Sequence, residues 1–84
     1  MPDQIENTMR VICKENGLQR DDVKIIMNPS LPQSKTKQAQ LFRGKKGQMV
    51  FVVTSTQRVM DYLVKESWGR RGIKGAAIFY RRAE

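Results

Sequence analysis

Arginine and lysine are the side chains of this chain that are most suited to a chemical role. Sixteen of them oppose eight acidic residues, which gives a formal net charge of +8 on 84 residues. Residues 1–34 hold four basic and five acidic side chains, a net charge of −1, whereas residues 35–84 hold twelve and three, a net charge of +9. Such asymmetry indicates a polyanionic partner, usually a nucleic acid.

The cationic side chains of the second half occur in short groups, two of which are flanked by glycines. Arginine makes bidentate contacts with phosphate, and lysine supplies a charge that tolerates varied geometry. Backbone N–H groups at glycine-rich turns add further capacity to bind anions. We therefore predict contacts with the phosphate backbone from Lys35, Lys37, Arg43, Lys45, Lys46, Arg70, Arg71, Lys74, Arg81 and Arg82.

One of these groups, Gly69-Arg70-Arg71-Gly72, fits the GxxG pattern with which KH domains clamp a nucleic-acid backbone. A KH loop lies between two helices, whereas the residues after Gly72 have the pattern of a strand. A glycine that ends a helix, followed by a turn, is therefore the favoured interpretation.

Catalysis and metal binding have weak support in the composition. The chain has no histidine, which removes the usual general base and the commonest metal ligand. Its one cysteine gives neither a disulfide nor a metal-site spacing, so we expect no metal and no cofactor. A small histidine-free RNase stays open as an alternative, in which Tyr80, Arg81 and Arg82 would stabilise charge and transfer protons.

The nature of the partner is the next question. Few aromatic residues are free for base recognition, because most of the six fall on predicted core faces. We therefore expect binding led by backbone and shape, with RNA slightly favoured over DNA by analogy with compact α+β domains. The main alternative is a regulator that docks on an acidic protein through an exposed edge strand near 23–27. Homodimerisation through an edge strand is compatible with each hypothesis.

The N-terminal half predicts a helix, a strand and a long loop. Apolar residues at helical spacing predict a helix over about 4–16, with Asp3 as the N-cap and Gly17 at its left-handed end. β-Branched residues predict a strand over 23–27. Prolines and polar residues then predict a mobile loop at about 28–38.

The C-terminal half predicts a hairpin, a helix and a last strand. Residues 40–43 and 48–54 have strand patterns on either side of Gly44-Lys45-Lys46-Gly47, which predicts a tight turn. A helix capped by Thr54 follows, and residues 73–82 alternate like a strand.

These elements predict a single small α+β domain over residues 1–84, in the order α-β-β-β-α-β. The economical arrangement is one mixed or antiparallel sheet with two helices packed on one face. No apolar run approaches the length of a membrane span, and the first residues lack a secretory signal pattern. A cytoplasmic location without membrane contact is the default expectation.

Overall fold

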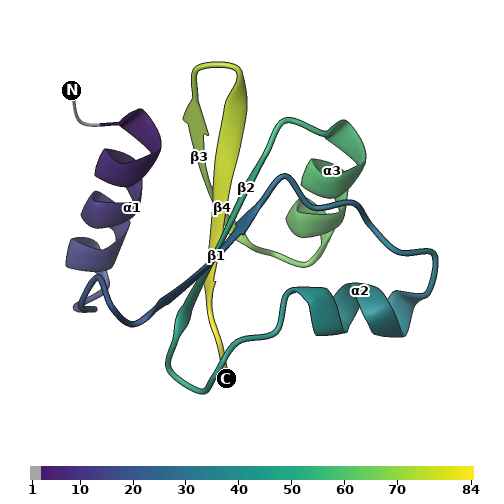
Figure 1. The fold of residues 1–84 in the computed structure, drawn as a ribbon, viewed down its shortest axis with the longest axis horizontal. Coiled ribbons are helices and arrows are strands. Elements are labelled where there is room, and N and C mark those ends of the chain that lie inside the picture. The colour runs from purple at the N-terminus through teal and green to yellow at the C-terminus, as the bar shows by residue number, and fades with distance from the viewer. Residues whose placement is uncertain (1–2) are drawn as a thin grey trace.

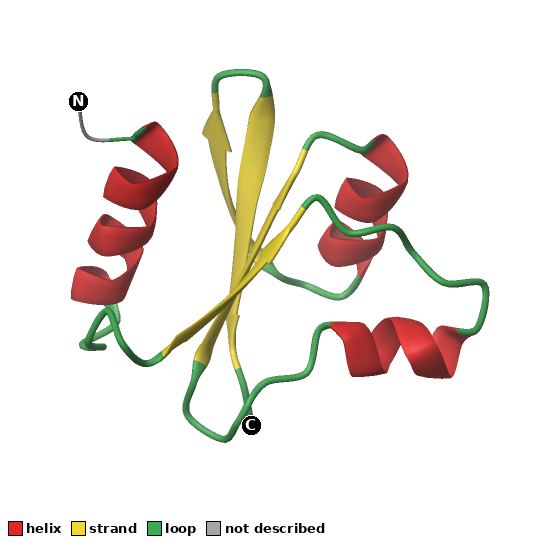
Figure 2. Cartoon of the chain, in the orientation of Figure 1, coloured by secondary structure: helices red, strands yellow, loops and turns green. Residues whose placement is uncertain are grey.

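The sheet and its helices account for most of residues 3–84, the part of the chain that the computed structural model describes (Figures 1 and 2). The elements follow the order α1 (Gln4–Glu15), β1 (Val23–Met27), α2 (Lys35–Leu41), β2 (Met49–Thr54), α3 (Gln57–Lys65), β3 (Gly69–Ile73) and β4 (Ala76–Arg82). In this described part of the chain, no helix combines the length and the apolar character that crossing a membrane requires.

The sheet is mixed, with the strand order β1-β2-β4-β3. β1 and β2 are parallel, and α2 lies in the crossover between them, while β4 runs antiparallel to both β2 and β3. The predicted α+β class and mixed sheet are therefore confirmed, although the order of elements differs from the predicted one.

Helices cover both faces of the sheet, so the prediction that both helices pack on one face is wrong. β2 is buried at every position, and its side chains alternate between two hydrophobic clusters. Met49, Phe51 and Val53 pack with α1, whereas Val50 and Val52 pack with α3 and the residues after α2. Figure 1 shows α1 on one side of the sheet and α2 and α3 on the other. A strand that is apolar on both faces requires this second layer.

The ends of α1 follow the sequence prediction. The Asp3 carboxylate accepts a hydrogen bond from the Ile5 N–H at 3.1 Å. Gly17 has φ +67°, and the next N–H, of Leu18, donates to the Cys13 carbonyl at 2.9 Å. This pattern is a Schellman motif, in which glycine takes the left-handed position at no steric cost.

The predicted loop at 28–38 and the predicted strand at 40–43 are wrong in part, because a helix occupies 35–41. Ser34 caps α2, and its hydroxyl accepts from the Lys37 N–H at 3.5 Å. The sequence of α2 lacks the apolar stripe by which a helix is recognised, and none of its residues is buried. The pattern of apolar residues therefore could not predict this helix. The Gly44–Gly47 segment consequently links α2 to β2 and does not close a hairpin.

The last part of the chain forms two strands where the sequence predicted one. β3 begins at Gly69, pairs with β4 and ends at Ile73, and the turn that follows contains Gly75 with φ +77°. The predicted strand at 73–82 therefore spans this turn as well as β4. The start of α3 also differs: Thr54 is the last residue of β2, and Thr56 is the N-cap.

Candidate nucleic-acid interface

The alternation of side chains along β3 and β4 divides the predicted arginines between the two faces of the sheet. Arg81 lies opposite Val50, whose side chain belongs to the α3 face, and Arg70 lies opposite Phe79 on that same face. Arg71 and Arg82 occupy the intervening positions and lie on the α1 face. In each of the two Arg-Arg pairs, the neighbouring side chains therefore lie on opposite faces of the sheet and cannot contact the same ligand surface.

The two arginines of the α1 face attach the sheet to the end of α1. Arg71 Nη2 donates to Glu15 Oε1 at 2.7 Å, and Arg82 Nη2 donates to the backbone carbonyl of Asn16. Hydrogen bonding to the Tyr80 side chain and the negative charge of Glu15 raise the pKa of Arg71 above its ordinary value. Part of the hydrogen-bonding capacity of both arginines is thus used inside the domain.

On the opposite face, Arg43, Arg70 and Arg81 form a group that we call the arginine face. The guanidinium of Arg70 lies 5.8 Å from the centre of the Phe79 ring, within the range of a cation–π contact. Because Arg70 pairs with Phe79, Arg81 is its diagonal neighbour two residues further along β4. Arg43 follows α2, and its backbone carbonyl accepts a hydrogen bond from Lys24 Nζ at 2.6 Å.

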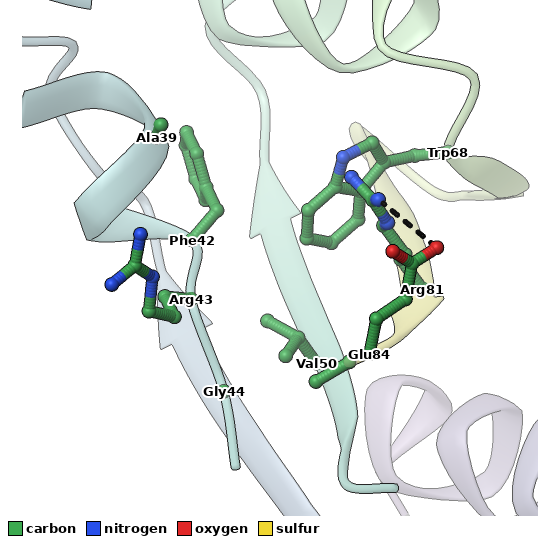
Figure 3. Close-up of a pocket in the computed structure, with 9 residues that line it drawn as sticks. Ala39, Phe42, Arg43, Gly44, Val50, Trp68, Arg81 and Glu84 are labelled. Carbon is green, nitrogen blue, oxygen red and sulfur yellow. Dashed lines mark ion pairs between the residues drawn. The ribbon is translucent and has the colours of Figure 1, made fainter. Parts of the chain in front are cut away.

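A cavity of about 340 Å³ lies within the arginine face, between the end of α2 and the end of β4 (Figure 3). The Phe42 and Trp68 rings meet edge to face, with their centres 5.7 Å apart. Figure 3 shows Phe42 and Arg43 on the α2 side and Trp68 and Arg81 on the sheet side. The cavity is lined by Ala39, Phe42, Arg43, Gly44, Val50, Trp68, Arg81, Ala83 and Glu84.

The remaining predicted cations lie elsewhere. Lys45 and Lys46 line a separate hollow together with Asp21 and Asp22, whose carboxylates oppose their charge. The first turn of α2 carries Lys35 and Lys37, and both are exposed.

Lys74 lies in the β3–β4 turn, at the opposite end of the sheet from the Gly44–Gly47 turn (Figure 1). Its N–H donates to the side chain of Gln4 at 3.4 Å. The ten predicted residues therefore do not form one continuous surface.

Few of the cations are neutralised within the domain. In residues 3–84, three of the sixteen lysine and arginine side chains form an ion pair: Arg20 with Glu6 at 2.9 Å, Arg71 with Glu15 at 2.7 Å and Arg81 with Glu84 at 3.8 Å. On the arginine face, Arg81 alone has a carboxylate partner in this part of the chain. Exposed pairs of this kind contribute little to stability.

The side chains predicted to act in an RNase, Tyr80, Arg81 and Arg82, do not all lie together in the structure. Tyr80 lies on the α1 face, where it packs with the cluster around Phe51, whereas Arg81 lies on the other face. Within residues 3–84 there is also no group of three side chains that could hold a metal ion. Cys13 is buried, and this burial raises the pKa of its thiol.

Sequence reasoning missed Trp68, Phe42 and Lys24 as parts of this region. The period-two pattern of residues 73–82 could have separated Arg81 from Arg82, because it places Phe79 and Arg81 on one face. The position of Trp68 opposite Arg81 depends on β3, which has no apolar alternation. Comparison of the chain with known protein families, with curated proteins and with solved structures finds no match in any of the three.

Proposed function

We propose that this chain is a non-enzymatic nucleic-acid-binding domain that contacts the phosphate backbone through the arginine face. The observation that carries the proposal is that Arg43, which follows α2, and Arg81 of β4 line one cavity, with Arg70 of β3 as the diagonal neighbour of Arg81 on the same face of the sheet. Two of them have no carboxylate partner in residues 3–84. The partner of the third, Glu84, has a side chain that is 91% exposed.

Binding would proceed by neutralisation of phosphates and release of counterions. A net charge of +9 on residues 35–84 attracts the polyanion over a distance, and the guanidinium groups then make the direct contacts. Because the released counterions return to solution, affinity falls steeply as salt rises. We propose RNA as the ligand, in a cytoplasmic setting, with DNA as the competitor to be tested.

Fluorescence anisotropy tests the proposal with labelled single-stranded and double-stranded RNA and DNA, at about 50 and 200 mM salt. We expect binding to at least one ligand at the lower salt concentration, and weaker binding at the higher one. The ranking of the four ligands then decides between RNA and DNA. Absence of binding to all four at the lower salt concentration would overturn the proposal.

A charge-matched pair of double variants locates the contact surface. Arg43→Ala/Arg81→Ala removes two charges from the arginine face, and Arg10→Ala/Lys14→Ala removes two from α1, on the other side of the sheet. The proposal requires the first variant to lose much more affinity than the second. Equal losses would show that net charge, and not this surface, determines binding.

The alternative of a protein partner is favoured by one specific feature, the free edge of β1. β1 is a terminal strand of the sheet, and on its α1-side face Ile25 is 38% and Met27 is 58% exposed. An acidic segment could add a strand there through main-chain hydrogen bonds. Saturable binding to a purified protein, weakened by Ile25→Glu, in a chain without affinity for nucleic acid, would support this alternative.

A further inference from the structure

The cavity lined by Trp68 and Arg81, here called the Trp68 cavity, has a size and a chemistry of its own. Its volume of about 340 Å³ falls in the range of small-ligand sites, and most of its accessible lining is polar. Val50, Phe42 and two alanines supply apolar wall, while Arg81 and Trp68 supply hydrogen-bond donors. Glu84 is the acidic residue among those lining it.

The indole N–H of Trp68 is available to a ligand. Trp68 is 8% exposed, and none of the side-chain hydrogen bonds within residues 3–84 involves its Nε1. In this same part of the chain, no buried side-chain nitrogen or oxygen lacks a hydrogen-bond partner. The indole N–H is therefore not sealed in the core, and a tryptophan N–H in such a position normally finds an acceptor.

The two arginines take different places around the Trp68 cavity. Figure 3 shows Arg81 on the same side as Trp68, with its guanidinium paired to Glu84. Arg43 extends from the α2 side away from both, so its charge lies at the rim of the cavity. A ligand that enters the cavity would thus lie beside the two touching rings and meet Arg81 inside and Arg43 at the rim.

The indole N–H and the two guanidinium groups fit a ligand that has hydrogen-bond acceptors, a planar part and a negative charge. A nucleobase has carbonyl and ring-nitrogen acceptors for the indole N–H, and its plane can stack on a guanidinium. The phosphate attached to it would lie toward Arg43, on the surface already proposed to follow the backbone. A base that is paired within a duplex cannot enter such a space.

We infer that the Trp68 cavity takes one unpaired nucleotide of a single-stranded nucleic acid. The inference rests on the proposed function and adds to it a preference for unpaired strands. Arg43 and Arg70 contact phosphates of any strand, whereas Trp68 and Arg81 contact the inserted nucleotide.

Trp68 is the single tryptophan of the chain, so its fluorescence reports directly on this cavity. The experiment titrates the full chain with a single-stranded oligonucleotide and with the duplex of the same sequence. It records both the anisotropy of a label on the oligonucleotide and the tryptophan emission. We expect the single strand to change the Trp68 emission and to bind about fivefold or more tighter than the duplex.

A cavity-filling variant keeps the test independent of folding defects. Ala39 is exposed on α2 and lines the cavity, so Ala39→Leu narrows the space and retains a good helix-forming residue. It should abolish the preference for the single strand and leave duplex affinity unchanged. The matched control is Ala39→Ser, which adds one oxygen atom where leucine adds three carbon atoms.

The outcomes separate the two proposals. If neither oligonucleotide binds, the proposed function fails and the inference fails with it. If both bind equally and Trp68 emission stays constant, the backbone proposal stands and the inference is overturned. A single-strand preference that survives Ala39→Leu would also overturn it.

Discussion

The ring of Tyr80 lies over the α-carbon of Gly69, its partner on the neighbouring strand. A Cβ added at residue 69 would overlap Cε2 and Cζ of the ring and would lie 2.9 Å from its hydroxyl oxygen. The glycine thus provides the space that the ring fills, and the aromatic side chain covers the backbone that the glycine leaves bare. Tyr80 in turn packs against the cluster beneath α1.

Gly69→Ala should therefore destabilise the domain by about 1–3 kcal/mol, because the Tyr80 ring must leave its packed position. The measurement is the free energy of unfolding in denaturant. Gly72→Ala is the control in the same strand, since a Cβ there meets no atom of residues 3–84 within 4 Å and the backbone has ordinary φ. It should be neutral or slightly stabilising. Equal destabilisation by the two variants would contradict this account of Gly69.

The Arg20–Glu6 pair should make stability depend on pH in acid. Arg20 donates two hydrogen bonds to the Glu6 carboxylate, both at 2.9 Å, and these bonds hold the pKa of Glu6 below its ordinary value. Because the pKa of Glu6 is lower in the folded protein than in the unfolded chain, the pair stabilises the fold fully at pH values above the pKa of Glu6 in the unfolded chain. This stabilisation is lost as the pH falls through the folded pKa.

Arg20→Ala should flatten this part of the pH profile, and unfolding experiments at a series of acidic pH values measure it. Lys14→Ala removes the same charge from the exposed side of α1 and should leave the slope as it is. An Arg20→Ala profile that parallels that of the unmodified chain would show that the pair has no such role.

The salt dependence of binding measures how many phosphates the arginine face neutralises. Each phosphate that is no longer neutralised lowers the slope of log affinity against log salt by about 0.9 for duplex DNA. Arg43→Ala/Arg70→Ala, which removes the two arginines proposed to contact phosphates of any strand, should therefore reduce the duplex slope by about 1.8. The Arg10→Ala/Lys14→Ala variant should change it by much less, and an equal change in the two would argue against the proposed surface.

Glu84 competes with the inserted nucleotide for Arg81. Glu84→Gln removes the carboxylate 3.8 Å from the guanidinium and should raise single-strand affinity about twofold to fivefold, the scale of an exposed ion pair. Asp61→Asn makes the same change of charge on α3, away from the residues that line the cavity, and should raise affinity less. A titration at constant salt measures both. Equal gains would indicate a general effect of charge.

Cys13 should be almost inert in the folded protein. Its side chain is 3% exposed, and burial raises the pKa of the thiol, so the reactive thiolate is scarce at neutral pH. Labelling by a thiol reagent should be slow in buffer and complete in denaturant. Leu18→Ala should speed the reaction, because Leu18 packs against the cluster that holds Cys13. Rapid stoichiometric labelling without denaturant would contradict the buried position.

The sequence predicted those elements that have an apolar pattern of their own. The stripe Ile5, Met9 and Ile12, closed by Gly17, was sufficient for α1, and the apolar run at 49–53 identified the central strand. α2 has no buried residue, and β3 consists of Gly-Arg-Arg-Gly-Ile with exposed central positions. β3 is formed by its pairing with β4, which local propensity does not reveal, and α2 has no buried face from which an apolar pattern could arise.

The candidate site was predicted as a set of charges and not as a surface. Alternation along β4 separates Arg81 from Arg82, and this could be foreseen from the residues. The pairing of Arg82 with Asn16 and the approach of Lys45 to Asp21 could not, because they depend on how distant segments meet. For the same reason, the position of Trp68 opposite Arg81 required the structure.

The strand pairings also differ in how much chain separates the residues that meet. β3 and β4 are joined by a turn of two residues, whereas Val23 of β1 pairs with Met49, across the whole α2 crossover. Closing the longer loop costs more entropy, so we expect β1 to join the sheet late in folding and to detach early in local unfolding. Arg70 and Arg81 belong to the hairpin and would keep their places while β1 opens. In hydrogen exchange, amides of β1 should therefore exchange before those of β4.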